Sequence, residues 1–204
     1  MSQTPPQPTG RNRPGAVSAA VWIQILLALF LVAQAVVGFL YGADAQDAAE
    51  AELEAQGFST SDLPDGFTFE GGGVNAIVFI AFAVLLVVFA LLNAAGNRVG
   101  RILTWIVQPL VLICSGVLAF GIIAGAASLD AGLEASGTEG IDAQALMDAA
   151  YGAYPSWTPV VDYGVVALGV LGSLLVVILL ALPAANAYFR KEEPEKFIPG
   201  APAA

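Results

Sequence analysis

The sequence contains no histidine and only one cysteine, Cys114, among its 204 residues. Histidine is the commonest general base and metal ligand, so its absence removes many catalytic and metal-binding arrangements. A single cysteine excludes an intramolecular disulfide, and Cys114 lies in an apolar run, where we expect a small packing side chain. The sequence also lacks a phosphate-cradling glycine loop and a nucleophile paired with a base. We therefore predict a protein that is not an enzyme and that carries no cofactor.

Charged residues are missing from four long segments. Apolar residues make up 57 % of the chain, compared with about 45–50 % in an average soluble protein. The excess lies in four runs of at least 20 residues without Asp, Glu, Lys or Arg. About 20 helical residues cross the hydrocarbon core, where backbone groups must be hydrogen-bonded internally. We predict an all-α membrane protein with four transmembrane helices, at about residues 16–42, 74–95, 102–127 and 163–189.

Basic residues are few, and their positions predict the orientation. The seven occur before the first run, between the second and third, and after the fourth: Arg11, Arg13, Arg98, Arg101, Arg190, Lys191 and Lys196. Eight acidic residues lie in 43–73 and six in 128–162. The positive-inside rule then predicts two hairpins in the plasma (inner) membrane, with both termini cytoplasmic and loops 43–73 and 128–162 outside. A cleavable signal peptide is the alternative for the first run, which is too long for one.

The polar segments outside these runs differ in character. Residues 1–15 are rich in Pro, Gln, Thr and Gly and are predicted to be a disordered cytoplasmic tail, while 190–204 form a second tail. The outer loops each contain a stretch of helix-forming residues, at about 44–56 and 142–151, predicted to be short amphipathic helices. Gly57 is well placed to end the first of these helices. Together the two loops could form a small lid.

Four uncharged polar residues stand out within the predicted transmembrane domain (16–189), namely Gln24, Gln34, Asn93 and Gln108. Transporters and pumps usually carry ionisable groups at membrane depth, and these runs have none. We expect the four side chains to form hydrogen bonds between helices. The alternative is that they line a polar permeation path.

Small residues recur at a spacing of four in three of the runs: Gly38, Gly42, Gly121, Gly125, Gly169 and Ser173. This spacing places each pair on one helix face, where another helix can approach closely. The partner helix can belong to the same chain or to another. An offset of 83 residues aligns the first pair with the second. Two explanations are open: duplication of a helical hairpin, and a chance match between common residues. Pro109 and Pro183 are predicted to kink the third and fourth helices.

Three acidic residues of the first outer loop, Asp47, Glu50 and Glu54, share one helix face by their spacing. Like charges at these positions repel by a few tenths of a kcal/mol per pair, roughly. A divalent cation would relieve this repulsion, which makes the three residues candidate metal ligands. A solvated acidic face is the simpler interpretation.

The segment LALPAANAYFR at 180–190 and the segment YPSW at 154–157 resemble uncharacterised small four-span membrane proteins of high-GC actinobacteria. This resemblance implies a location and an architecture but no activity or site. The leading hypothesis is an accessory or scaffold subunit of a membrane assembly, whose partners are the lipid bilayer and other membrane proteins or a second copy. The alternatives are a small channel or transporter, and an extracytoplasmic sensor of cations or envelope components. No nucleic-acid partner is expected.

Overall fold

The computed structural model describes residues 12–64, 66–69 and 73–190. Most of the predicted N-terminal tail and all residues after Arg190 lie outside this part of the chain. Every regular element among the described residues is helical. In chain order they are α1 (Gly15–Ala55), η1 (Thr60–Asp62), α2 (Val74–Ala94), α3 (Arg98–Ser136), α4 (Ala143–Gly152), α5 (Thr158–Ala167), the π-helical η2 (Leu168–Gly172), α6 (Ser173–Ala181) and α7 (Pro183–Phe189).

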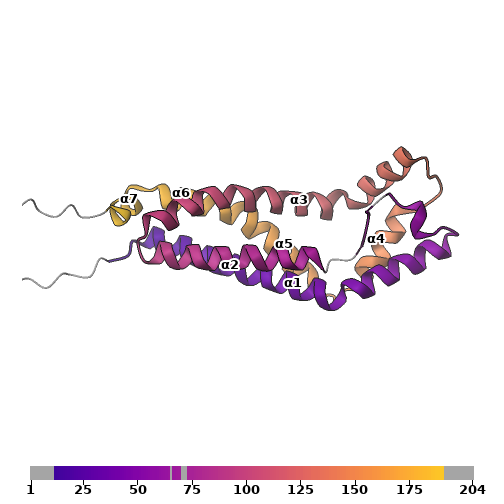
Figure 1. Cartoon of the computed structure of the whole chain (residues 1–204), viewed down its shortest axis with the longest axis horizontal. Helices are drawn as coiled ribbons and strands as arrows, with labels where there is room; N and C mark the ends of the chain where they lie inside the picture. Colours follow the sequence, from indigo (N-terminus) through magenta and orange to yellow (C-terminus); the bar gives the residue numbers. More distant parts are fainter. Residues whose placement is uncertain (1–11, 65, 70–72, 191–204) are drawn as a thin grey trace, which may run out of the picture.

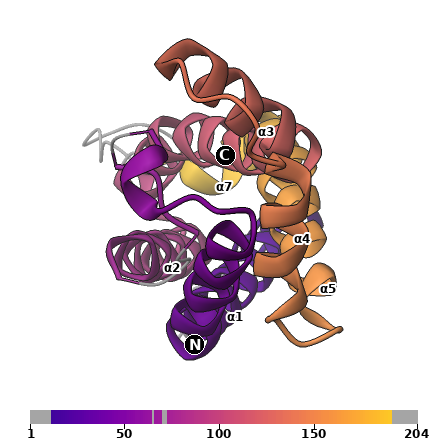
Figure 2. The ribbon, with the colours of Figure 1, turned by 90° about the vertical axis from the view of Figure 1, so that its right-hand side faces the viewer.

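Four helices are long and apolar enough to cross a membrane: α1, α2, α3 and the continuous rod from Thr158 to Ala181 formed by α5, η2 and α6. The prediction of an all-α protein with four such helices is therefore confirmed. They form a four-helix bundle in which α1 and α3 each pack against both α2 and α6 (Figures 1 and 2). We call the end with the start of α1, the α2–α3 turn and α7 the basic end, and the end with α4 the acidic end.

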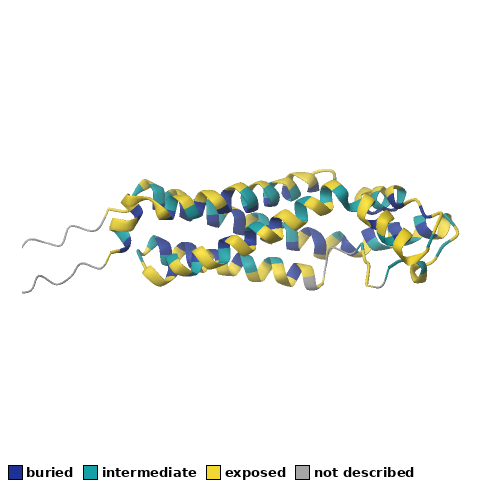
Figure 3. Cartoon of the chain, turned by 90° about the horizontal axis from the view of Figure 1, so that it is seen from above, coloured by how far each residue is buried: buried dark blue, intermediate teal, exposed yellow. Residues whose placement is uncertain are grey.

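The inner faces of the bundle are buried, and the outer faces are exposed apolar surface. Leu27 and Leu86 pack in the central core, and Val176 and Leu180 pack nearer the basic end. Exposed residues run along the outer sides of the long helices (Figure 3), and many are large and apolar, such as Ile123, which is 85 % exposed. Apolar surface of this extent marks a membrane or protein interaction site.

Helix α1 does not end where its predicted membrane span ends. It continues past Gly42 to Ala55, a length of 41 residues or about 60 Å. The segment after Gly42 contains no proline and is rich in Ala and Glu, so nothing interrupts the helix. The short helix predicted at 44–56 is therefore the last part of α1 and not a separate element. Helix α3 likewise extends to Ser136, where Gly137 ends it with a φ of 80°.

The fourth helix also differs from its predicted limits. It begins at Thr158, contains the π turn η2, and ends at Ala181, because Leu182 is extended (φ −59°, ψ 149°) before Pro183. A residue that precedes proline is pushed out of the helical region, so the expected distortion at Pro183 is present. The kink predicted at Pro109 is absent: Pro109 lies inside α3, and the kink of that helix is at Ala124, which has non-helical dihedrals (φ −123°, ψ 15°).

The two loop segments pack on each other at the acidic end. Leu53 of α1, Leu129 of α3 and Leu146 of α4 share a small core there. The backbone N–H of Asp142 donates to Oε1 of Gln56 (2.7 Å). Figure 1 shows α4 lying between the extended ends of α1 and α3, so this end is a packed cap.

Candidate functional site: a buried polar seam and two ends of opposite charge

A row of uncharged polar side chains runs through the bundle interior. Thr104, Gln108 and Ser115 are spaced by four and seven residues, so they share the inner face of α3. They meet polar residues from the other three long helices. We call this row the polar seam, and its buried members are Gln24, Asn93, Thr104, Gln108, Ser115 and Ser173.

The part of the seam nearer the basic end joins three helices. Nδ2 of Asn93 donates to Oγ1 of Thr104 (2.8 Å) and to Oε1 of Gln24 (3.2 Å). The Thr104 hydroxyl in turn donates to the carbonyl of Gly100 (2.8 Å). Nε2 of Gln24 and Oδ1 of Asn93 are buried without a hydrogen-bond partner among the described residues. This cluster therefore ties α1, α2 and α3 together and still has one donor and one acceptor available.

The next part of the seam joins α3 to the fourth helix. The Ser173 hydroxyl donates to Oε1 of Gln108 (3.3 Å), while Nε2 of Gln108 is buried without a partner among the described residues. Ser115 lies against Gly169, where an added Cβ would be 1.9 Å from its Oγ. Buried amide groups are normally satisfied by protein or ordered water, so the unpartnered amide atoms are the part of the seam with hydrogen-bonding capacity left. It contains no charged group that would bind an ion or carry a proton.

Gln34 is separate from this seam and lies toward the acidic end. Its side chain is hydrogen-bonded to the half-buried carboxylate of Asp162 on α5. From the sequence, Asp162 was expected at the end of an outer loop, but α5 begins at Thr158, so Asp162 is in the second turn of a membrane-length helix. Pro159, at the second helical position, is the signal that marks this earlier start. An ionisable group is thus present near the acidic end of the bundle.

The three pairs of small residues have different surroundings. Gly38 and Gly42 are buried, as are Gly169 and Ser173, so these pairs are used within the chain. Gly121 is exposed, and a Cβ added to it would have no atom within 4 Å. The other member of its pair, Gly125, lies close to Met147 of α4. The chain therefore leaves Gly121 uncovered.

The candidate metal ligands Asp47, Glu50 and Glu54 lie on the part of α1 that extends into the acidic end. Glu50 accepts a hydrogen bond from Nε2 of Gln46 (2.7 Å), and Asp47 and Glu54 are exposed. Within the described ranges, no group of three or more Asp, Glu or Cys side chains is arranged to hold a metal ion. The cation-sensor hypothesis therefore gains no coordination geometry from these residues.

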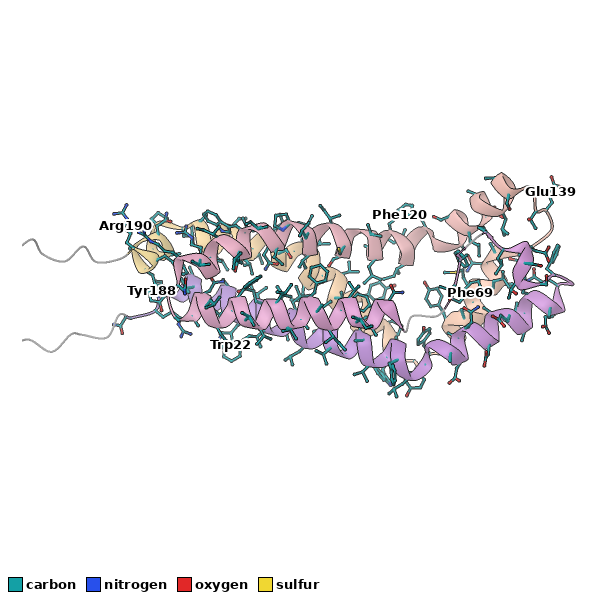
Figure 4. The ribbon with its side chains drawn as sticks, viewed as in Figure 1. Trp22, Phe69, Phe120, Glu139, Tyr188 and Arg190 are labelled. Carbon is teal, nitrogen blue, oxygen red and sulfur yellow. The ribbon has the colours of Figure 1, made fainter. Side chains whose placement is uncertain are left out.

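Each end of the bundle carries a surface groove with charged walls. At the acidic end, a groove of about 390 Å³ is lined by residues of α3 and the following loop, including Asp130, Glu134 and Glu139. At the basic end, a groove of about 420 Å³ lies between the first turns of α3 and the end of α7. Figure 4 labels Glu139 at one end and Tyr188 and Arg190 at the other.

We call the second of these the basic groove, and its lining residues are Arg98, Arg101, Ile102, Trp105, Asn186, Phe189 and Arg190. Nε of Arg98 donates to the carbonyl of Phe189 (2.8 Å). The Arg101 guanidinium donates to Oδ1 of Asn186 and lies 4.5 Å from the ring centroid of Trp105. From the sequence, these arginines served only to predict orientation. Their i, i+3 spacing is a local signal that the two arginines share one face of a helix, but the sequence does not show that α7 packs beside them.

Together these features define a helical protein with four membrane-length helices, a neutral polar interior and ends of opposite charge. Comparisons of the chain with protein-family models, with curated proteins and with solved structures find no match.

Proposed function

We propose that this chain is a non-enzymatic, multi-pass protein of the plasma membrane that serves as an accessory or scaffold subunit of a larger membrane assembly. Both termini lie on the cytoplasmic side in this proposal, because the basic end carries Arg98 and Arg101 and the acidic end carries the outer carboxylates. One observation carries the scaffold role. Of the most apolar stretch of α3, 11 % is buried, against 28–39 % in the other three helices.

The uncovered face of α3 has the form of a helix-packing surface. Leu110, Cys114, Val117 and Gly121 follow one another at intervals of four, three and four residues, and all are exposed. Lipid-facing positions favour large apolar side chains, whereas a glycine lets another helix approach the backbone. We call this stripe the α3 face. A transmembrane helix of a partner protein or of a second copy is the occupant that fits it.

The only cysteine of the chain provides a direct test, because Cys114 lies on the α3 face. A maleimide that carries a photoreactive benzophenone would be attached to Cys114 in native membranes and activated, and adducts would be identified by mass spectrometry. We expect a reproducible protein adduct from Cys114. The matched control is the variant Cys114→Ser with Ile77→Cys, since Ile77 is 68 % exposed on α2. Equal adduct yields from both positions, or none from Cys114, would contradict the scaffold role.

A small channel is the second candidate, favoured by the unpartnered amide groups in the seam. The path would pass Gln24, Asn93 and Gln108 in the seam and then Gln34 beyond it, and the neutral side chains of all four suit water or small uncharged solutes. Flux into liposomes that contain the purified protein measures this directly. If replacement of Gln34 and Gln108 by leucine leaves the flux unchanged, the channel hypothesis is wrong.

A further inference from the structure

The basic groove brings together arginines from two separated parts of the chain. Arg98 and Arg101 lie in the first turns of α3, and Arg190 follows α7. The break at Leu182 makes this possible, because it ends α6 and lets Phe189 accept a hydrogen bond from Arg98. Among the described residues that line the groove, three are arginines and none is Asp or Glu. The described walls of the groove therefore concentrate positive charge without a carboxylate.

Two features of Arg98 and Arg101 show that their positive charge is not fully compensated by the described residues. Nε of Arg101 is buried and has no hydrogen-bond partner among the described residues. In addition, Arg98 and Arg101 lie at the N-terminus of the 39-residue helix α3, where the helix dipole is positive and disfavours cations. An anion bound at the guanidinium groups would offset the unfavourable position of these cations at the helix N-terminus. Guanidinium groups are planar donors that match phosphate oxygens in bidentate pairs, so phosphate is the anion chemistry that fits.

The apolar part of the groove indicates where the phosphate comes from. Trp105 is 39 % exposed and holds the Arg101 guanidinium over its ring, and Ile102 is 56 % exposed. Ile106, one turn further along α3, is 57 % exposed and continues this apolar surface away from the groove. A ligand with an anionic head and acyl chains contacts both parts, whereas free phosphate contacts only the arginines. Tryptophan and arginine are also typical of the headgroup level of a membrane.

We propose that the basic groove binds the phosphate of an anionic phospholipid, with Arg98, Arg101 and Arg190 around the headgroup and Trp105 and Ile102 against its acyl chains. This proposal rests on the membrane placement proposed above but not on the scaffold role. Basic pockets beside transmembrane helices on the cytoplasmic side are suited to anionic headgroups. The site would fix the basic end at the inner leaflet.

Trp105 allows the site to be observed in the full-length chain. The chain has three tryptophans, so Trp22→Phe with Trp157→Phe leaves only Trp105. This variant would be placed in two kinds of phosphatidylcholine vesicle. One contains a fixed fraction of phosphatidylglycerol with brominated acyl chains, and the other contains the same fraction of phosphatidylcholine with brominated acyl chains. We expect stronger quenching of Trp105 by the brominated phosphatidylglycerol. Equal quenching by the two lipids would overturn the proposal.

Charge-matched variants separate the groove from general attraction to the membrane. Arg101→Gln is expected to lower the preference for phosphatidylglycerol about fivefold, the effect of one arginine near an anionic surface. Arg13→Gln removes the same charge at the same end of the bundle but from outside the groove lining, and should keep the preference. If both variants lose it equally, the groove is not the site. Arg101→Lys keeps the charge and tests the bidentate geometry should the glutamine variant not fold.

Two further measurements test whether the phosphate belongs to a lipid or is free in solution, and whether the protein is inserted in the membrane at all. Inorganic phosphate at millimolar concentration should leave the quenching preference intact, and its loss would identify soluble phosphate as the ligand and overturn the lipid assignment. A variant with Trp22 as its only tryptophan tests membrane insertion alone, because Trp22 is 69 % exposed on α1. Quenching of Trp22 together with no lipid preference at Trp105 would reject the lipid site while the membrane placement stands.

Discussion

At the scale of single residues, the contact between Gly169 and Ser115 leaves the least room for an added Cβ among the described glycines. A Cβ at position 169 would lie 1.9 Å from Oγ and 2.5 Å from Cβ of Ser115. We predict that Gly169→Ala destabilises the protein by about 1–3 kcal/mol, the usual cost of an overpacked core. Thermal unfolding in mild detergent would measure the loss.

The same contact provides its own rescue and control. Ser115→Gly removes both clashing atoms, so the double variant with Gly169→Ala should recover most of the lost stability. Gly121→Ala makes the same chemical change where an added Cβ meets nothing within 4 Å, and should not lower the melting temperature of the monomer, because alanine favours helix more than glycine does. A neutral Gly169→Ala variant would show that α3 and η2 separate more easily than this packing implies.

The sequence identifies polar residues in apolar runs but not which of them meet. Gln24, Asn93 and Gln108 were recognisable because amides are rare in such runs. Thr104 was missed because a single threonine in an apolar helix carries no distinctive signal, although it lies within 2.8 Å of the Asn93 amide. The sequence places Asp162 at the end of an outer loop, because the fourth uncharged run begins just after it. Its partner Gln34 is far away in sequence, so only the packing of α1 against α5 reveals the pair.

At the scale of elements, hydropathy predicts where lipid ends but not where a helix ends. Helices α1 and α3 continue beyond their apolar runs because the following residues still favour helix. Helix α4 shows that a local capping signal gives a better limit. The side chain of Asp142 accepts a hydrogen bond from the backbone N–H of Ala145 (3.0 Å) at its N-terminus, as an N-cap residue does.

Replacement of Asp142 tests how far α4 depends on this cap. Loss of an N-cap costs about 1 kcal/mol, so Asp142→Ala should speed amide exchange in the first turn of α4 about fivefold. Asp142→Asn keeps a side-chain acceptor and should exchange at nearly the rate of the unaltered chain. Hydrogen exchange followed by NMR makes the comparison. Equal amide protection in both variants would mean that the apolar core of the packed cap, and not the N-cap hydrogen bond, holds the start of α4.

The 3₁₀ turn η1 predicts a pH effect confined to the acidic end. The backbone N–H and the hydroxyl of Ser59 both donate to Oδ2 of Asp62, at 2.8 and 2.9 Å. These bonds favour the charged carboxylate and lower the pKa of Asp62 below its ordinary value of 3.8, with the backbone bond as the larger cause. The turn is therefore stabilised above pH 3.8 and loses this stabilisation as the pH falls through the lowered pKa.

Carboxyl NMR titration of Asp62 measures this shift. Ser59→Ala removes the hydroxyl donor but keeps the backbone donor, so the pKa of Asp62 should rise but remain below its ordinary value. Ser61→Ala is the matched control, because Ser61 bonds to the Ser59 hydroxyl and not to the carboxylate. A pKa that does not move in Ser59→Ala would show that the hydroxyl bond does not form in solution.

At the scale of the whole molecule, the sequence predicts the four apolar helices because each of them is a continuous stretch of chain. The neighbours of each helix are set by contacts between distant residues, such as the bond from Asn93 of α2 to Gln24 of α1 across 69 positions. The basic groove depends on such contacts too, since it needs the break at Leu182 to bring α7 beside α3. Spans are thus readable from composition, whereas grooves and the packed cap require the fold.

The opposite charges of the two ends lead to the prediction that concerns the whole bundle, its orientation. In the variant Cys114→Ser, one new cysteine would be placed at Ser61 in the acidic end or at Ala95 in the turn between α2 and α3. Both original residues are small and exposed, so the two changes are matched. We expect a membrane-impermeant maleimide to label Ser61→Cys on intact cells and to label Ala95→Cys only after permeabilisation, because Arg98 and Arg101 next to Ala95 favour the cytoplasmic side. The opposite labelling pattern would show that the topology is the reverse of the one predicted. Labelling of both cysteines from outside would contradict a bundle whose two ends lie on opposite sides of the membrane.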